Sequence, residues 1–533
     1  MVGSAATCFG QSFTSSNPLE ISPALSGNFG ELRPNHFHAG IDLKTSGVVN
    51  LPVHSVEDGH VSRIKISPYG YGKVIYIDHP NNYTTVYAHL NGFPKRIQDY
   101  VRSVQYDQQS FAIDVYPGTS DLPVKKGDII GLSGNTGGSG GPHLHYEIRE
   151  TDTEVPRNPL LFNFPIEDTK PPVIEAIAIH EAATKTTKRY RVSNGGYINS
   201  NKPISIRGAF GVEMSGFDSQ NGSSNQNGIF ELRCFVDNEL ISVLTSDSIP
   251  FDVGRQLNAL IDYEHYYRTH QRFVRLYRLP GNFLPILKAR NNGYISLPEG
   301  KHEVRLVAAD AASNKSEVSF LVYVESSDVP NKPAESEMIQ CRAAYFYESE
   351  NFRLSVPRYS LYEDVAQDIE ETENSIRFLT PFIPIQHPLE VQIKAAPRDG
   401  EVLARLNNEG KPVQALATKR SGDWLMAESK SSGWFGVTYD LRPPSISSVN
   451  YRSGKTYTSG DITFSIADNF SGIESFEVRI NEQWVLAEYE PKQSRLAVSV
   501  NEIEPSEALQ EFTVEVRDMA GNVATFDGSF YRR

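Results

Sequence analysis

The segment that most constrains the fold of this chain is residues 140–149, where a glycine-rich loop leads into a run of alternating polar and apolar residues. Successive side chains of a β-strand point to opposite faces. One face of the predicted strand therefore carries His143, His145, Glu147 and Arg149. The other face carries Leu144, Tyr146 and Ile148, which predicts a core face. Two imidazoles on one rigid strand are either hydrogen-bonded surface groups or part of a site, and the rest of the chain decides between these readings.

Short β-type runs broken by Gly, Pro and Asn extend through residues 19–166, so this part is predicted to be all-β. Asp58-Gly59 predicts a hairpin within residues 51–66, and Asn81-Asn82 predicts another between residues 74–77 and 83–90. Residues 127–134 and 143–149 add two strands. One insertion differs, because its apolar residues follow helical spacing and predict a short helix over residues 96–106 that packs on the sheet. Those residues are Ile97, Tyr100, Val101 and Val104.

At 533 residues the chain is too long for one core, and about 150 residues per domain gives three or four domains. A weak internal repeat supports this division. Pro171-Pro172 and Pro443-Pro444 each open a β-rich segment, and each segment closes on an Asp-x-Ala-x-Asn turn, at residues 310–314 and 518–522. The pattern resembles bacterial immunoglobulin-like sandwiches.

These observations predict a mainly β chain with a first β domain followed by three β-sandwich domains of immunoglobulin-like type. The predicted boundaries are a flexible segment at 1–17, a first domain at 18–166 with an insertion at 91–124, an immunoglobulin-like domain at 171–327 with an insertion at about 250–298, a β-rich domain at 332–441, and an immunoglobulin-like domain at 443–533. The second insertion is rich in Tyr, Arg and Leu, and packing against a neighbouring domain is preferred there over a ligand surface.

Composition excludes several classes of protein. The net charge of −14 disfavours a nucleic-acid binder, which needs a basic surface. Three cysteines far apart provide neither a disulfide framework nor a cysteine-rich metal site. No apolar run approaches the roughly 18 residues of a membrane span. The first residues lack the basic and apolar regions of a signal peptide, so the sequence itself gives no direct sign of export. No sequence feature specifies an oligomeric state.

Eight of the thirteen histidines lie between residues 36 and 145. A catalytic zinc site needs three N or O ligands and one open position, and two histidines with one aspartate satisfy this requirement. Further imidazoles nearby can orient water and stabilise an oxyanion. The candidates are His36, His38, Asp42, His89, His143 and His145. Spacing alone does not decide between His36 and His38, or between His143 and His145.

Other motifs fit less well. Residues 38–42 have the i, i+4 spacing of a helical zinc motif, but Gly40 and the β-type surroundings disfavour a helix. Residues 137–141 match Gly-x-Ser-x-Gly, yet the nucleophile elbow needs a helix after it and here a strand follows. The glycine-rich run at 131–141 lacks the Gly-Lys-Ser/Thr of a phosphate loop. His54, His60 and His79 lie in or beside turns and are predicted to be surface residues.

The chain closely resembles the lysostaphin/LytM-type zinc endopeptidases over about residues 25–165. The signatures occur in the family's order: His38-Ala39-Gly40-Ile41-Asp42, Gly70-Tyr71-Gly72, Tyr87-Ala88-His89-Leu90, Lys126-Gly127-Asp128, Ser133-Gly134-Asn135-Thr136-Gly137 and Gly141-Pro142-His143-Leu144-His145-Tyr146-Glu147. Departures are Lys73 for the usual Asn, Tyr146 for a common Phe, and the long segment 91–124, which alters one wall of the groove. The overall layout resembles exported endopeptidases of Bacteroidetes-type bacteria.

This resemblance implies a two-sheet β fold with Zn²⁺ held by His38, Asp42 and His145. It assigns His89 and His143 to the catalytic pair beside the zinc-bound water, and it leaves His36 outside the pattern. It implies hydrolysis of peptide bonds in peptidoglycan, with the protein exported to the periplasm or cell envelope. Two alternatives are a catalytically silent wall-binding or regulatory protein and a zinc peptidase acting on proteins. The three later domains are expected to space, to bind wall or a partner, or to cover the groove.

Overall fold

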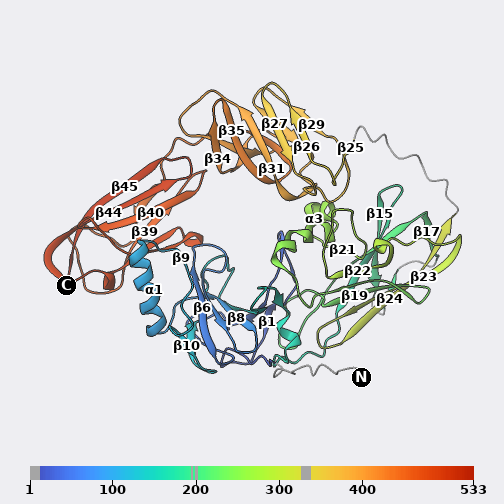
Figure 1. Ribbon diagram of the computed structural model, residues 1–533, viewed down its shortest axis with the longest axis horizontal. Helices are drawn as coiled ribbons and strands as arrows, with labels where there is room; N and C mark the ends of the chain where they lie inside the picture. Colours follow the sequence, from blue (N-terminus) through green and yellow to red (C-terminus); the bar gives the residue numbers. More distant parts are fainter. Residues whose placement is uncertain (1–12, 194–195, 199–201, 326–337) are drawn as a thin grey trace, which may run out of the picture. The chain divides into compact units, whose positions relative to one another are not determined.

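The computed structural model describes residues 13–193, 196–198, 202–325 and 338–533. Its regular structure is mostly β-strand, which confirms the mainly β prediction (Figure 1). Two units are present: the first comprises Met1–Val101, Asp114–Arg278 and Asn282–Asn331, and the second comprises Arg102–Ile113, Leu279–Gly281 and Lys332–Arg533. Most of the predicted flexible segment, and the junction at residues 326–337, lie outside the described residues.

The first domain is built on a nine-stranded sheet, in the order β1-β4-β12-β8-β7-β6-β10, with β13 paired to β12 and β9 to β6 (Figure 1). A two-stranded sheet pairs β5 with β11, and another pairs β2 with β3. The strands are β1 Leu25–Gly27, β2 Leu32–Arg33, β3 His36–Phe37, β4 Ile41–Lys44, β5 Pro52–His54, β6 Gly59–Ile66, β7 Lys73–Asp78, β8 Tyr83–Leu90, β9 Ile113–Val115, β10 Pro123–Val124, β11 Ile129–Leu132, β12 His143–Glu150 and β13 Pro156–Arg157, followed by the 3₁₀ helix η1 Pro159–Leu161.

Strand β12 is central in this sheet, because it pairs antiparallel with β4 on one side and with β8 on the other. In this register His145 lies directly opposite Asp42 on β4 and Ala88 on β8. The alternation expected from the sequence is present, but both faces of the strand are buried: Tyr146 is fully buried, and so is Glu147 on the opposite face. The polar face therefore lines an enclosed site and is not a solvated surface.

Two of the local predictions for this domain are confirmed and two are wrong. Strands β7 and β8 form the expected hairpin, and α1 Lys95–Gln108 is the expected helix. The hairpin at Asp58-Gly59 is wrong, because β5 pairs with β11 while β6 pairs with β7 and β10. Asp58 instead accepts hydrogen bonds from Lys125 Nζ and Lys126 N, at 2.9 Å each, and so ties this bend to the loop before β11.

The second wrong prediction concerns the start of the chain. Phe13 and Ser15 are buried, and the Ser15 hydroxyl lies 2.9 Å from the Tyr146 hydroxyl, so residues 13–17 are packed and not loose. In α1, Ile97 and Val101 are buried as expected. Residues 102–113, however, belong to the second unit.

The region after residue 171, for which an immunoglobulin-like domain is predicted, is one mixed sheet in the order β21-β18-β14-β15-β16-β24-β23-β19-β20-β22, with β17 on β24. Its elements are β14 Val173–Glu181, β15 Thr186–Ser193, β16 Tyr197–Ile198, β17 Ile204–Arg207, β18 Phe210–Phe217, β19 Glu231–Val236, β20 Glu239–Thr245, η2 Phe251–Gln256, α2 Leu257–Leu260, α3 Tyr263–Thr269, β21 Val274–Arg275, β22 Leu287–Ala289, η3 Arg290–Gly293, β23 Gly300–Ala309 and β24 Lys315–Glu325.

This region and the first domain share one hydrophobic core. Phe29, which precedes β2, and Phe37, which ends β3, are buried in the same cluster as Ile177 and Phe210 of the region after residue 171. The chain approaches so closely at Gly30 (φ +75°) that a Cβ there would lie 2.8 Å from the Ser246 side chain. The insertion contributes as well, since Asn258 Nδ2 donates to Asn35 Oδ1 at 3.0 Å. The two predicted domains are therefore packed as one body, and the insertion packs on a neighbour as expected.

The second unit contains two further β domains, each with its own core. The first pairs the sheets β26-β27-β31-β35-β34 and β29-β30-β36-β32-β33, and the second pairs β37-β39-β43-β42 with β38-β45-β44-β40-β41. The strands are β25 Met338–Ile339, β26 Tyr345–Glu348, β27 Phe352–Val356, β28 Val365–Ala366, β29 Ile369–Glu371, β30 Ser375–Phe378, β31 Pro384–Lys394, β32 Glu401–Leu406, β33 Pro412–Ala415, β34 Thr418–Ser421, β35 Trp424–Ser431, β36 Gly433–Tyr439, β37 Ser445–Ser448, β38 Thr456–Tyr457, β39 Asp461–Ala467, β40 Ile473–Ile480, β41 Gln483–Trp484, β42 Ala487–Glu490, β43 Arg495–Ser499, β44 Ser506–Asp518 and β45 Val523–Arg532, with the 3₁₀ helices η5 Pro491–Gln493 and η6 Val500–Glu502.

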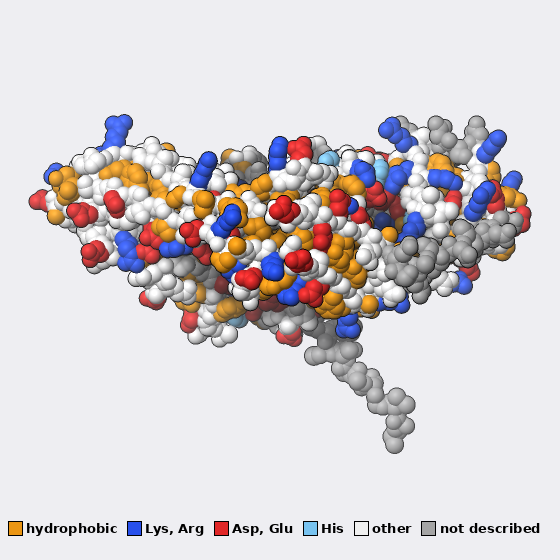
Figure 2. Space-filling view, turned by 90° about the horizontal axis from the view of Figure 1, so that it is seen from above, with side chains coloured by type: hydrophobic (Ala, Val, Ile, Leu, Met, Phe, Trp, Pro, Cys, Tyr) orange, Lys and Arg blue, Asp and Glu red, His pale blue; other side chains and the backbone are white. Residues whose placement is uncertain are grey.

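The surface carries charges of both signs. On the face shown in Figure 2, acidic and basic side chains are interspersed among hydrophobic ones, with no single large basic area. Among the described residues no helix is long and apolar enough to cross a membrane.

The shared core predicts a stability effect. We expect Phe37→Ala to lower the free energy of unfolding of the first unit by about 3–5 kcal/mol, because it leaves a cavity in a well-packed core. Denaturant unfolding measures this change. Val48→Ala, at a side chain that is 48% exposed, is the control and should change stability by less than about 0.5 kcal/mol. Equal effects of the two substitutions would contradict a shared core.

Candidate metal centre

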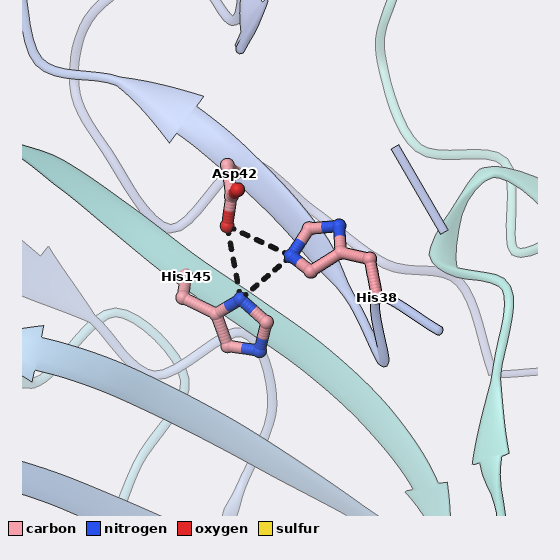
Figure 3. A group of neighbouring side chains, drawn as sticks. All are labelled: His38, Asp42 and His145. Atoms are coloured by element: carbon pink, nitrogen blue, oxygen red, sulfur yellow. Dashed lines mark hydrogen bonds and ion pairs between the residues drawn. The ribbon is translucent and has the colours of Figure 1, made fainter. Parts of the chain in front are cut away.

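Three buried side chains converge on one point in the first domain (Figure 3). Asp42 on β4 and His145 on β12 face each other across the strand pair, and His38 reaches them from the loop before β4. Asp42 Oδ1 lies 3.0 Å from His38 Nε2 and 2.9 Å from His145 Nδ1, and the two ring nitrogens are 3.0 Å apart. The turn between His38 and Asp42 needs Gly40, because a Cβ at that position would lie 2.3 Å from the Tyr146 carbonyl oxygen.

In His38 and His145, the ring nitrogen that points away from the cluster already donates a hydrogen bond. His38 Nδ1 donates to the Asn28 carbonyl oxygen at 2.7 Å, and His145 Nε2 donates to Glu147 Oε1 at 2.8 Å. In neutral rings, His38 Nε2 and His145 Nδ1 are therefore both lone pairs directed at the same place. Two lone pairs and a carboxylate at 3.0 Å repel one another unless a proton or a cation lies between them.

A chain of charges supports His145 from behind. The Glu147 carboxylate accepts hydrogen bonds from His145, from the Tyr71 hydroxyl, and from Arg149 Nε at 2.6 Å. The Arg149 guanidinium lies between the rings of Tyr76 and Phe251, at 5.3 and 4.6 Å from their centroids. Burial would raise the pKa of Glu147, but Arg149 and His145 outweigh it and lower the pKa to about 2. Glu147 is therefore ionised and fixes the orientation of the His145 ring.

Asp42 is held in a similar way. Its second oxygen, Oδ2, accepts a hydrogen bond from Arg33 Nη2 at 2.9 Å, and Arg33 also pairs with Glu31 at 3.2 Å. Burial opposes ionisation of Asp42, but the charge of His38 and the hydrogen bonds from the histidines hold its pKa well below the usual range. Arg33 therefore leaves Oδ1 as the oxygen that faces the two imidazoles.

His89 and His143 lie beside this cluster. Their ring centroids are 4.8 Å apart, and His143 Nε2 is 3.4 Å from Asp42 Oδ1. Each is oriented through Nδ1: His89 donates to the Thr136 carbonyl and His143 to the Gly141 carbonyl, at 2.9 Å each. The Nε2 atoms of both rings therefore point away from these anchors. Thr136 belongs to the glycine-rich loop, which packs on residues 70–72 through the hydrogen bond from Gly138 N to the Gly70 carbonyl at 2.7 Å.

The imidazoles of His89 and His145 differ in basicity. Burial lowers the pKa of His89 to about 3, and the neighbouring His145 and His143 add to the shift. Burial would also lower the pKa of His145, but its hydrogen bonds to Asp42 and Glu147 raise the pKa to about 9. Without a metal the cluster is therefore satisfied by a proton on His145, and a metal ion that binds there displaces that proton. His89 is neutral and able to accept a proton.

The remaining sequence candidates lie elsewhere. His36 is exposed, with Nδ1 on the Pro34 carbonyl at 2.9 Å, and it stays outside the cluster. His54 and His60 are half-buried. The prediction that His79 is a surface residue is wrong: it is 5% exposed, it bonds the Asp58 carbonyl and the Thr85 hydroxyl, and it stacks on Phe13. It is a satisfied core histidine.

Sequence reasoning missed the supporting residues. Glu147 and Arg149 were placed on the histidine face of the strand, and a carboxylate two residues from a candidate ligand is a signal for an orienting partner. Arg33 and Asn28 carried no such signal. Asn28 reaches the site through the fold: its side chain exchanges hydrogen bonds with Gly228, in the region after residue 171, at 2.7 and 2.9 Å, while its carbonyl holds His38.

The donor set fits a divalent metal ion. Ligand atoms about 2.0–2.1 Å from a tetrahedral ion lie about 3.3–3.4 Å from one another, close to the separations of 2.9–3.0 Å found here. Two imidazoles and one carboxylate leave a fourth position open. A buried cluster of two imidazoles and one carboxylate, beside two further oriented imidazoles, is the kind of centre found in metal-dependent hydrolases.

Comparison with known proteins identifies the domain. The model of peptidase family M23 matches residues 36–106 and 112–159. An uncharacterized metalloprotease of Haemophilus influenzae is 35% identical over 136 residues, which are 26% of this chain and 22% of that protein. The peptidoglycan DD-endopeptidase ShyA of Vibrio cholerae is 33% identical over 160 residues, covering 29% of this chain and 31% of that protein. The catalytic domain of lysostaphin from Staphylococcus simulans is 23% identical and covers 26% of this chain and 88% of that one, with a TM-score of 0.19.

Residues 36–159 therefore carry a peptidase family M23 domain, which confirms the resemblance seen in the sequence. The chain spans less than a third of the length of these two curated relatives. The match lies within the first of the two units.

The charge chain behind His145 predicts a metal-affinity effect. We expect Glu147→Gln to weaken binding of a divalent probe such as Zn²⁺ by about 10–100-fold, because the substitution removes the anion that orients the His145 ring. Competition against a chromophoric chelator measures the affinity. Glu154→Gln, at a side chain that is 63% exposed, is the control and should leave the affinity unchanged.

Asn28 allows a sharper comparison. We expect Asn28→Ala to weaken metal binding by about 10-fold, because the carbonyl that holds His38 loses its anchor on Gly228. Asn225→Ala is a matched control, since Asn225 Nδ2 crosses the same interface to the Ser26 carbonyl at 3.3 Å without contacting His38. If both variants weaken binding equally, the effect belongs to the interface and not to the orientation of His38.

Proposed function

We propose that this protein is a zinc metalloendopeptidase that hydrolyses peptide bonds in peptidoglycan stem peptides or cross-links. The observation that carries the proposal is the convergence of His38, Asp42 and His145 within 3.0 Å, next to His89 and His143, in a family M23 domain. In this proposal the first three residues hold the zinc ion, and His89 and His143 are catalytic residues. Nitrogen and oxygen ligands in a three-plus-one arrangement suit Zn²⁺.

Each group of the chain has a part in this reaction. When bound, Zn²⁺ supplies a Lewis acid that polarises a carbonyl and lowers the pKa of a water molecule. His89, anchored at Nδ1 on the Thr136 carbonyl, directs Nε2 to this space and positions the attacking water. His143, anchored at Nδ1, directs Nε2 to the same space and stabilises the negative charge that develops on the carbonyl oxygen. Arg33 and Glu147 keep the ligand atoms aligned.

The relatives support the proposed substrate. The Vibrio cholerae relative is named a peptidoglycan DD-endopeptidase, which favours cell-wall peptide over protein as the substrate of this domain. Such a substrate implies action in the periplasm or cell envelope. We further propose that the β domains at 171–327, 332–441 and 443–533 space the active domain from the envelope, bind wall or a partner, or cover its groove. The first of them also supports His38 through Asn28.

Purified sacculi test the proposal. We expect the full-length protein to release muropeptides, identified by mass spectrometry, and a chelator to stop the release until Zn²⁺ is restored. His145→Ala should abolish release, and His89→Ala should slow it by about 10²–10⁴-fold, because each removes a group that the reaction needs. His36→Ala is the control and should retain full activity, because His36 is exposed and outside the cluster.

The outcomes separate the alternatives. Release at the wild-type rate by His145→Ala would overturn the mechanism. Stoichiometric Zn²⁺ binding without any release from sacculi would show a catalytically silent wall-binding protein. Cleavage of a glycine-rich peptide panel or of proteins, with intact sacculi, would show a protein peptidase.

A further inference from the structure

Two groups of three aspartates recur at equivalent places in the internal repeat. Asp168, Asp218 and Asp310 each bring one carboxylate oxygen within 4.8 Å of the others, and so do Asp440, Asp468 and Asp518. We call these the first and second Asp triplets. In both, the first aspartate precedes the Pro-Pro pair by three residues, and the last opens the Asp-x-Ala-x-Asn turn. Each triplet lies within one unit, the first triplet in the first unit and the second in the other.

The hydrogen bonds around the two triplets also match. The Asn314 side-chain amide donates to Asp310 Oδ2 at 2.8 Å and to the Asp168 carbonyl at 3.1 Å. In the second triplet the Asn522 amide donates to Asp518 Oδ2 at 2.8 Å and to the Asp440 carbonyl at 2.9 Å. The asparagine at the end of each turn thus ties the last hairpin of the domain to the segment where the chain enters it. The two copies of the repeat therefore share a local structure as well as a sequence motif.

The first triplet holds an unsatisfied buried oxygen. Asp218 is 2% exposed, and its Oδ2 accepts from Gln220 Nε2 at 3.0 Å, while its Oδ1 is buried without a hydrogen-bond donor. Asn227, which is paired with Asp218 through two backbone hydrogen bonds, also has a buried Oδ1 without a donor. A buried carboxylate oxygen that accepts no hydrogen bond destabilises the fold, so such an atom indicates a missing partner.

The second triplet has the same feature at a side chain that is half-buried. Asp468 Oδ2 accepts from the backbone N–H groups of Phe470 and Gly472, at 2.9 and 2.7 Å, whereas its Oδ1 is buried without a donor. In both triplets, Oδ1 of the middle aspartate therefore accepts no hydrogen bond. Unsatisfied atoms at two equivalent positions indicate a ligand that both places share.

Nearby cations do not neutralise the first triplet. Within the described part of the chain, no Lys, Arg or His forms an ion pair within 4.0 Å with Asp168, Asp218 or Asp310. Lys170 uses its ammonium group on the carbonyls of Gln220 and Ser223, at 3.0 and 3.5 Å. Burial first, and then the charges of Asp168 and Asp310, raise the pKa of Asp218 to about 7. The three carboxylates repel one another, and the charge of Lys170 offsets this in part at Asp168 without an ion-pair contact.

We propose that each Asp triplet binds a calcium ion. Ca²⁺ takes oxygen ligands at about 2.3–2.6 Å, so two ligands on opposite sides of the ion are about 4.6–5.2 Å apart, which fits oxygens lying within 4.8 Å of one another. Carbonyl oxygens and water complete its six to eight ligands. An all-oxygen, triply acidic set differs from the two-histidine centre at His145, so the two kinds of site select different metals. The ions join the start of each immunoglobulin-like domain to its last hairpin.

Calorimetric titration of the full-length protein with Ca²⁺ tests the proposal, with one equivalent of Zn²⁺ already present. Two Ca²⁺ per chain are expected. Asp218→Asn and Asp468→Asn should each remove one, and the double variant should remove both, because the amide cannot replace the charge. Asp99→Asn, at a side chain that is 61% exposed, is the control and should bind two. Mg²⁺ should bind more weakly, since it requires a tighter octahedral site.

Thermal unfolding separates lost binding from misfolding. Ca²⁺ at 100 times its dissociation constant should raise the melting temperature of the wild type by several degrees. Without Ca²⁺, Asp218→Asn should melt no lower than the wild type, because it removes a buried and uncompensated charge, but it should lose the response of the first unit. No heat of binding up to millimolar Ca²⁺, or two ions still bound by the double variant, would overturn the proposal. A single ion removed by Asp218→Asn alone would overturn it for the second triplet.

Discussion

The structure of the first domain depends on a local conflict: two imidazole lone pairs and a carboxylate oxygen are held within 3.0 Å of one another in a buried place. Such an arrangement is unfavourable unless a positive charge lies between the three atoms. The surrounding fold keeps the atoms together through bonds from outside, with Asn28 on His38, Glu147 on His145 and Arg33 on Asp42. These outer hydrogen bonds stop the three ligand atoms from moving apart. The atoms are therefore aligned in advance, without a flexible closure around an ion.

The second requirement is charge balance behind the ligands. Glu147 is fully buried and ionised, and Arg149 compensates it from the same strand face, while its guanidinium lies against the rings of Tyr76 and Phe251. Buried ion pairs need nearly complete hydrogen bonding to be tolerated, and here the Glu147 carboxylate accepts from His145 and Arg149 on β12 and from Tyr71 in the loop before β7. This explains why the polar face of a central strand remains polar although it is enclosed.

Much of this centre was visible in the sequence, because the period of a strand places His143, His145, Glu147 and Arg149 on one face, and the spacing of His38 and Asp42 recurs in known zinc endopeptidases. The α1 helix and the β7–β8 hairpin were predictable from local patterns. The register that sets Asp42 opposite His145 was not, because it joins residues 103 apart, and neither was the link from Asn28 to Gly228, 200 residues away. The Asp58-Gly59 hairpin failed for a related reason: a turn signal states that the chain bends, but not which strand it meets afterwards.

The burial of Phe29 and Phe37 in the core of the region after residue 171 has a consequence for how the chain is divided. The matched family segment stops at residue 159, yet the hairpin that leads to His38 is completed by side chains beyond residue 171. The unit of homology and the unit of folding therefore do not coincide. A fragment cut at residue 159 would expose Phe29 and Phe37 and would release the Asn28 carbonyl that orients His38. Such a fragment would be prone to aggregation and would bind metal poorly, although it still contained every motif of the family.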